Sequence, residues 1–84
     1  MSIRVSTNAD AQGTILRVDG RLTSEDVAEL SRTFADAAQP VVLDLSDLQW
    51  ADRAGVDLLR QFLTQGAETR GITPYFELVL KTRD

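Results

Sequence analysis

Alternating apolar and polar residues open the chain and predict a β-hairpin. One alternating run covers residues 3–7, and a second covers residues 14–19. Residues 8–13 lie between the two runs and include Asn, Asp and Gly, which favour turns. Alternation with a period of two is typical of strands with one buried face, and turn residues between two such runs indicate a hairpin.

Two later segments carry apolar residues three or four positions apart, which predicts amphipathic helices. The first begins after Thr23, where a hydroxyl residue precedes two acidic residues, and it ends at Pro40. The second runs over residues 52–70 and is followed by Gly71. Acidic residues in a first helical turn favour the positive end of the helix dipole, and glycine is common just past a helix end.

Apolar runs at residues 41–45 and 75–80 predict two more strands, and residues 46–51 are expected to form a loop. The order is therefore strand, strand, helix, strand, helix, strand. Strand–helix–strand crossovers are right-handed, so both helices should cover the same side of the sheet if the strands add outward in one direction. The predicted fold class is α/β: a two-layer, four-stranded mixed sheet (β-β-α-β-α-β) with two helices packed on one face.

The two faces of this sheet follow from the alternation. The covered face, against which we expect the helices to pack, carries Ile3, Val5, Leu16, Val18, Leu43, Leu45, Phe76, Leu78 and Leu80. The open face carries Arg4, Arg17, Asp44 and Glu77, interleaved with Ile15, Val42, Tyr75 and Val79. The open face is interpreted as a solvated surface with cross-strand charge pairs, and a second contact surface is the alternative.

Composition narrows the class of protein. The chain has 84 residues, 43% of them apolar and 26% charged, which is typical of one soluble domain covering residues 1–84. It has no cysteine and a net charge of −4, which disfavours disulfide-stapled secreted scaffolds, nucleic acids and anionic membranes as contexts. No apolar run reaches the roughly 18 residues of a membrane span. We therefore expect a cytoplasmic protein with no nucleic-acid partner and no direct membrane insertion.

The sequence offers little catalytic chemistry. It lacks histidine, the commonest general base near neutral pH, and its five glycines are scattered instead of forming a phosphate-binding loop. Asp44, Asp47, Asp52 and Asp57 raise the possibility of a Mg²⁺ site, but a sheet face, a helix cap and a first helical turn account for most of them. Trp50 is expected to fill space under the loop, with a binding platform as the alternative. We predict no enzyme, no catalytic residue, no metal and no cofactor.

Residues 41–55, VVLDLSDLQWADRAG, together with residues 18–22, VDGRL, resemble the STAS domain, the family named for sulphate transporters and anti-sigma factor antagonists. In that family Asp-Ser-Ser-Gly opens a helix, and a partner kinase phosphorylates the residue after the Asp. A phosphate there would meet the free N–H groups of a helix N-terminus. Here the four residues 52–55 read Asp-Arg-Ala-Gly, so Arg53 occupies the phosphoacceptor position and no phosphorylation is expected at this turn. Arg53 either contacts an acidic group on a partner or reflects drift in a domain that no longer uses the switch.

The resemblance implies a non-catalytic regulatory protein-binding module, similar to the anti-sigma factor antagonists of bacterial signalling and regulation of transcription. Its partner would be an anti-sigma factor serine kinase. The alternative is an accessory STAS subunit of a phospholipid ABC transporter that binds the transporter ATPase, and a STAS domain that binds a nucleotide or another small molecule is a third class. The expected partner-binding residues surround the start of the second helix: Ser46, Asp47, Asp52, Arg53, Ala54, Gly55 and Asp57.

Two further expectations concern surfaces outside this group of residues. Arg17, on the open face, is expected to lie apart from the docking site. The family usually carries a further helix and often another strand after the segment matched by residues 75–80. An open sheet edge is therefore expected, which a partner or a second copy in a homodimer could cover.

Overall fold

The computed structural model describes residues 3–81, and the side chains of Tyr75, Val79 and Lys81 lie outside what it describes. Its elements in chain order are β1 (Ile3–Asp10), β2 (Gly13–Leu22), the 3₁₀ turn η1 (Ser24–Asp26), α1 (Val27–Asp36), β3 (Val41–Asp44), β4 (Leu48–Ala51), α2 (Arg53–Thr64), β5 (Glu68–Arg70) and α3 (Pro74–Lys81).

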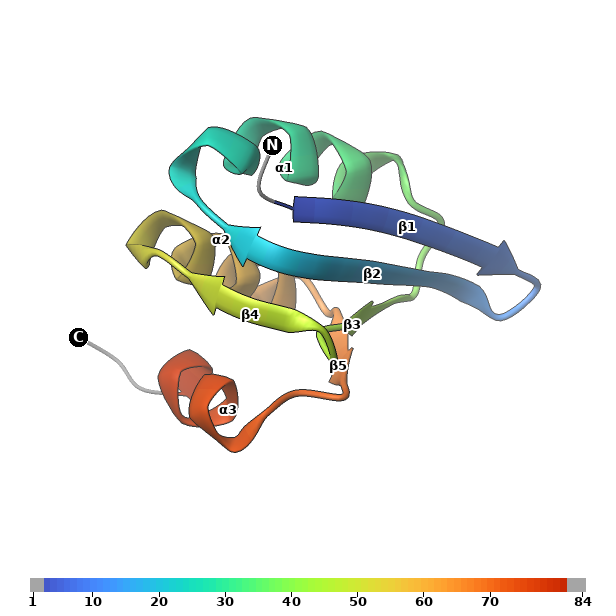
Figure 1. Ribbon diagram of the computed structural model, residues 1–84. Coiled ribbons are helices and arrows are strands. Elements are labelled where there is room, and N and C mark those ends of the chain that lie inside the picture. The colour runs from blue at the N-terminus through green and yellow to red at the C-terminus, as the bar shows by residue number, and fades with distance from the viewer. Residues whose placement is uncertain (1–2, 82–84) are drawn as a thin grey trace.

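The long strand β2 organises the sheet. On one side it pairs antiparallel with β1, as the predicted hairpin requires. On the other side it pairs in parallel first with β3 and then with β4, one after the other along its length. The strand β5 pairs in parallel with β3. Figure 1 shows α1 and α2 together on one side of this sheet, which confirms the predicted mixed α/β architecture.

The segment after β3, which we expected to be a loop, contains β4. The backbone turns at Ser46 and Asp47, and the Gly20 N–H donates to the Asp47 carbonyl at 3.0 Å. Leu48 then enters the core. β2 has ten residues and β3 only four, so the far half of β2 presents backbone groups that a second short strand can bond. This explains why a loop prediction from composition was wrong here.

The predicted extent of the second helix was also wrong at its end. Helix α2 stops at Thr64, where the expectation was Arg70. Gly66 has φ +102°, a conformation that glycine adopts easily and that terminates helices. The residues released from the helix form β5 at the border of the sheet.

The last predicted strand, residues 75–80, is the helix α3. Thr73 starts it: the Phe76 N–H donates to the Thr73 hydroxyl at 3.3 Å, and Pro74 occupies the first helical position. Phe76 and Leu80, one turn apart, are buried, whereas Leu78 is 68% exposed. The sheet therefore has five strands where four were predicted, and its fifth strand comes from residues 68–70.

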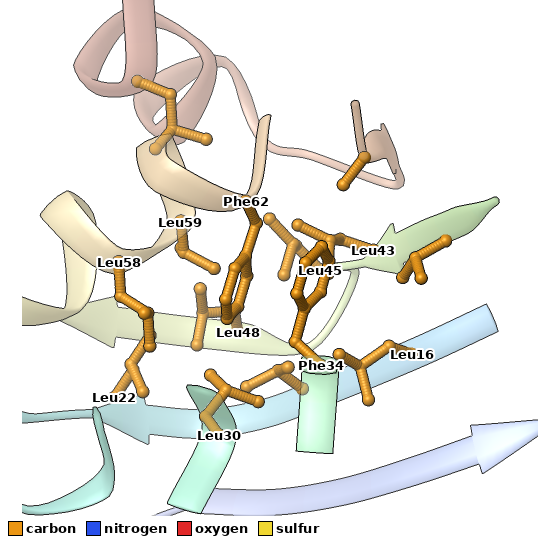
Figure 2. Close-up of a cluster of buried hydrophobic side chains, with 14 of the residues drawn as sticks. Leu16, Leu22, Leu30, Phe34, Leu43, Leu45, Leu48, Leu58, Leu59 and Phe62 are labelled. Carbon is orange, nitrogen blue, oxygen red and sulfur yellow. The ribbon is translucent and has the colours of Figure 1, made fainter. Parts of the chain in front are cut away.

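The core lies between the covered face and the helices (Figure 2). Leu16 and Leu43 on adjacent strands are fully buried, as the alternation predicted. Across the helix layer, the rings of Phe34 from α1 and Phe62 from α2 stack with centroids 4.0 Å apart and planes 10° from parallel. Ile3 is buried and Val5 half-buried, so the covered face extends onto β1. In residues 3–81, no helix is long and apolar enough to cross a membrane.

Candidate partner-docking site

The start of α2 is built around Asp52. Asp52 has the extended backbone of an N-cap, and its carboxylate accepts from the Gly55 N–H at 2.8 Å. The other carboxylate oxygen accepts from the Ser24 N–H at 2.9 Å, and the Asp52 N–H donates to the Leu22 carbonyl at 2.9 Å. One side chain therefore caps α2 and ties it to the turn that starts the first helical segment.

Gly55 is set against the end of β2. A Cβ on Gly55 would lie 2.8 Å from Leu22 Cγ, closer than real Cβ contacts allow, and 3.0 Å from the Leu22 carbonyl oxygen, which is also tight. Gly55 is buried, so its lack of a side chain serves the contact between α2 and β2. Together with the Asp52 bonds, this contact holds the first turn of α2 in one position.

The exposed members of the predicted site at this end are Arg53 and Asp57, with Ala54 half-buried between them. Asp57 makes an i,i+3 ion pair with Arg60 at 3.5 Å. The Asp57 side chain is 56% exposed, and an ion pair with so exposed a partner contributes little to stability. The first turn thus presents a cation and an anion on a rigid backbone.

Ser46 and Asp47 lie at the opposite end of β4. The four residues of β4 lie between Asp47 and Asp52, and the five steps from one to the other extend about 16 Å at the usual rise per residue. The structure therefore brings Asp52 to Asp57 together but leaves the other two as a separate group. The prediction treated all seven as one patch because a loop at residues 46–51 could have folded back.

Around Ser46 the chain builds a partly buried hydrogen-bond network centred on Asp44. The Ser46 hydroxyl and its backbone N–H both donate to the Asp44 carboxylate, at 2.5 and 3.1 Å, and the Arg70 guanidinium lies 3.5 Å from it. These bonds, led by the Ser46 hydroxyl, lower the pKa of Asp44 below its ordinary value, while burial opposes them. Gly71 has φ +70° and no side chain, and Ser46 occupies the space that a Cβ on Gly71 would need.

Arg17 was expected to lie apart from the docking residues, and the structure contradicts this. Its guanidinium forms an ion pair with Asp47, and its Nε donates to Asp19 at 2.9 Å. The hydrogen bond to Asp19 and the charges of both carboxylates raise the pKa of Arg17. The Asp44–Arg70 pair joins β3 and β5 and is a cross-strand charge pair of the kind predicted, whereas Arg17 and Asp19 lie on the same strand.

Trp50 does not fill space under a loop. It sits on β4, is 41% exposed, and the Arg21 guanidinium lies 5.1 Å from its ring centroid. Such a distance is within the range of a cation–π contact. The Arg21↔Trp50 register of the parallel β2–β4 pair creates this contact. No local sequence signal shows it, because β4 itself was not predicted.

The Asp residues that suggested a Mg²⁺ site are engaged separately, in the contacts described above. Within residues 3–81, His, Cys, Asp and Glu side chains form no group of three or more that could hold a metal ion. The acidic residues of this region therefore act as a helix cap and as ion-pair partners.

Comparison with known proteins identifies the family. A family model described as Mlab, STAS domain, matches residues 5–73, from β1 to the residue that caps α3. The chain belongs to the STAS domain family. In a comparison with curated proteins, none matches this chain.

Among solved structures, this STAS domain is similar to the crystal structure of an anti-sigma-factor antagonist STAS domain from Rhodobacter sphaeroides. The two share 28% identity with a TM-score of 0.61, and the match covers 82% of this chain and 84% of that chain. Antagonist STAS domains are generally non-enzymatic. The similarity therefore supports a regulatory role that depends on protein partners.

Proposed function

We propose that this STAS domain is a non-catalytic regulatory module whose protein partner docks over the N-terminus of α2. The proposed docking surface has two parts on either side of β4: the start of α2, with Asp52, Arg53, Ala54, Gly55 and Asp57, and the turn before β4, with Ser46 and Asp47. The observation that carries the proposal is the first turn of α2, where exposed charges stand on a backbone held by Asp52 and Gly55. A surface fixed before binding loses little freedom when a partner arrives.

Within the patch the residues have different roles. Asp52 and Gly55 hold the backbone from inside, since their contacts go to the Ser24 N–H and to Leu22. Arg53 and Asp57 supply exposed charges. Charged groups at the rim of an interface steer the encounter and select the partner more than they add affinity.

A partner that reaches both Arg53 and Asp47 has to cross β4, where Trp50 is exposed. Tryptophan and arginine are enriched among the residues that dominate binding energy. Trp50, held beside Arg21, is therefore the proposed apolar centre of a surface with charged ends. Since it is the single tryptophan of the chain, its fluorescence reports directly on docking.

The docking surface carries no phosphorylation switch at the family position. Arg53 and Ala54 provide no hydroxyl in the turn from Asp52 to Gly55. Incubation with ATP and the cognate kinase should leave this turn unlabelled, while Arg53→Ser should create an acceptor if the partner is a kinase of the anti-sigma type. Peptide mapping reads both results.

The proposed partner is an anti-sigma factor serine kinase, on the strength of the similarity to an anti-sigma-factor antagonist. The absent hydroxyl favours a second candidate, a constitutive accessory subunit that binds the ATPase of a phospholipid ABC transporter, because a permanent subunit needs no phosphorylation switch there. Capture of the partner from lysate, followed by mass spectrometry, separates a kinase-like protein from a transporter ATPase.

Arg53→Glu tests the docking surface by calorimetry with the captured partner. Reversing an interfacial charge should weaken binding by about 1 kcal/mol or more. Unfolding should change little because Arg53 is exposed. The matched control is Arg32→Glu on the exposed side of α1, since Arg17 contacts Asp47 and is not independent of the patch. Equal binding by wild type and Arg53→Glu, or equal losses in both variants, would refute docking at α2.

A further inference from the structure

The outer border of the sheet is formed by β1, a strand of eight residues. Figure 1 shows it, in blue, at the border with β2 on its inner side. Edge strands in native proteins are usually short, or carry proline, lysine or a bulge that blocks further pairing. β1 contains none of these residues, and its pairing with β2 runs without a register shift from end to end. The strand is therefore suited to bond another strand.

The hydrogen bonds of β2 show which groups of β1 face outward. The N–H groups of Thr14 and Gly20 donate to carbonyls on the β3–β4 side, so even-numbered residues of β2 point away from β1. Odd-numbered residues of β2 then bond β1, and their partners in the register are the even-numbered residues 4–10. The N–H and C=O groups of Val5, Thr7 and Ala9 consequently point to the free edge.

The side chains of β1 alternate between the two faces of the sheet. Ile3 is buried against the core and Val5 is half-buried, so the odd-numbered side chains lie on the helix side of the sheet. Arg4 and Asp10 lie on the open face and are exposed. They stand three residues before and three residues after Thr7, with opposite charges.

We propose that β1 pairs antiparallel with β1 of a second copy of this chain, with the two Thr7 residues opposite each other. In this register Val5 faces the partner's Ala9, and both have outward backbone groups, as a hydrogen-bonded pair requires. Arg4 faces the partner's Asp10, and the twofold symmetry repeats the contact. The two Arg4–Asp10 pairs are non-hydrogen-bonded pairs, in which opposed side chains lie closest. A shift by two residues removes both ion pairs, so charge selects the register.

The helix layer leaves room for this neighbour. Thr7 and Ala9 line a hollow of about 400 Å³, whose other side is formed by Thr33 and Asp36 near the end of α1. Both residues on β1 are exposed. Helix α1 therefore leaves the outer part of β1 uncovered on this face.

Sedimentation across micromolar to millimolar concentrations tests the proposal through charge reversal. Wild type should form a dimer, and Arg4→Asp should weaken it about tenfold or more, because two opposite-charge contacts become two like-charge contacts. Asp10→Arg should do the same. An equimolar mixture of the two variants should form a heterodimer, since its chains again place Asp opposite Arg at both positions. Arg53→Asp, a matched change on the α2 surface, should leave the dimer unaffected.

A second variant tests the backbone pairing and not the charges. Thr7→Pro removes an N–H that points to the free edge, so the hairpin with β2 keeps its bonds while the dimer loses its central ones. Circular dichroism verifies that each variant is folded. A wild type that remains monomeric at all concentrations would overturn the proposal. A dimer that survives Thr7→Pro would also overturn it. The same holds if the two charge variants associate no more strongly when mixed than each does alone.

Discussion

The two faces of the sheet use their side chains differently. On the covered face, residues such as Leu16 and Leu43 are fully removed from solvent and pack beneath the stacked rings of Phe34 and Phe62. On the open face, Ile15 on β2 is only half-buried, and Arg17, two residues along the strand, is charged and paired with Asp19. Burial of apolar area stabilises the fold, while exposed ion pairs contribute little.

The comparison separates stability from recognition. Large losses of stability are expected from changes on the covered face. Changes to exposed charges should act mainly on binding, because those groups remain solvated in the unbound domain. Asp44 lies between these extremes: it belongs to the open face, yet it is buried and fully engaged with Ser46 and Arg70.

The largest expected effect is on the covered face, for Phe62→Ala. Removing this ring deletes the stack with Phe34 and leaves a cavity, which typically costs about 3–5 kcal/mol. That is a large part of the 5–15 kcal/mol or so that stabilises a native domain. Urea unfolding followed by circular dichroism measures it. The control on the open face, Ile15→Ala, should cost less than half as much, and equal losses would show that the two faces are equally packed.

A smaller loss is expected for Gly55→Ala, where α2 meets the end of β2. The added methyl would overlap Leu22 and force the helix away, at a cost of about 1–3 kcal/mol. A double-mutant cycle with Leu22→Ala identifies the cause, because removing the Leu22 side chain relieves part of the overlap. Strict additivity of the two changes in unfolding free energy would contradict this account.

The smallest effect, and one that depends on pH, is expected for Ser46→Ala. Loss of the hydroxyl bond to Asp44 should cost about 1 kcal/mol near neutral pH. The folded-state pKa of Asp44 is lowered, so its contribution is present above the unfolded pKa of about 3.9 and is lost as the pH falls through the lower folded value. Ser46→Ala should raise the folded pKa and so reduce the total loss on acidification.

Carbon-detected NMR titration of the Asp44 carboxyl measures this pKa in both proteins. Ser6→Ala, which removes an exposed hydroxyl on β1, is the matched control and should leave the titration unchanged. The same Asp44 midpoint in Ser46→Ala and wild type would mean that the hydroxyl bond does not determine the pKa.

Much of the fold could be predicted from local sequence. The hairpin, the start of α2 at Asp52 and the buried strand β3 follow from alternation, a cap and a β-branched run. The helix ending was missed at Gly66, although the residue was visible, because Gly71 was taken as the terminator. Thr73 and Pro74 were likewise visible as a helix start but were interpreted as a bend.

The candidate site was only partly predictable. The residues at the start of α2 were identified from the family motif, and their caps follow from their order in the chain. The sequence could not show that β4 separates Asp47 from Asp52, or that Arg17 reaches Asp47. Those contacts depend on which strands pair and in what register.

By itself, the sequence determined the class of the protein: the periodicity of its apolar residues specifies two layers, and the residues before and at the start of α2 specify the family and the missing hydroxyl. Only the tertiary structure decided that residues 48–51 extend the sheet, that Trp50 is exposed beside Arg21, and that β1 forms a free border. The physical reason is that local patterns act over one turn or one strand. Pairing and burial join residues far apart in the sequence, as the bond between Ser24 and Asp52, 28 positions apart, does.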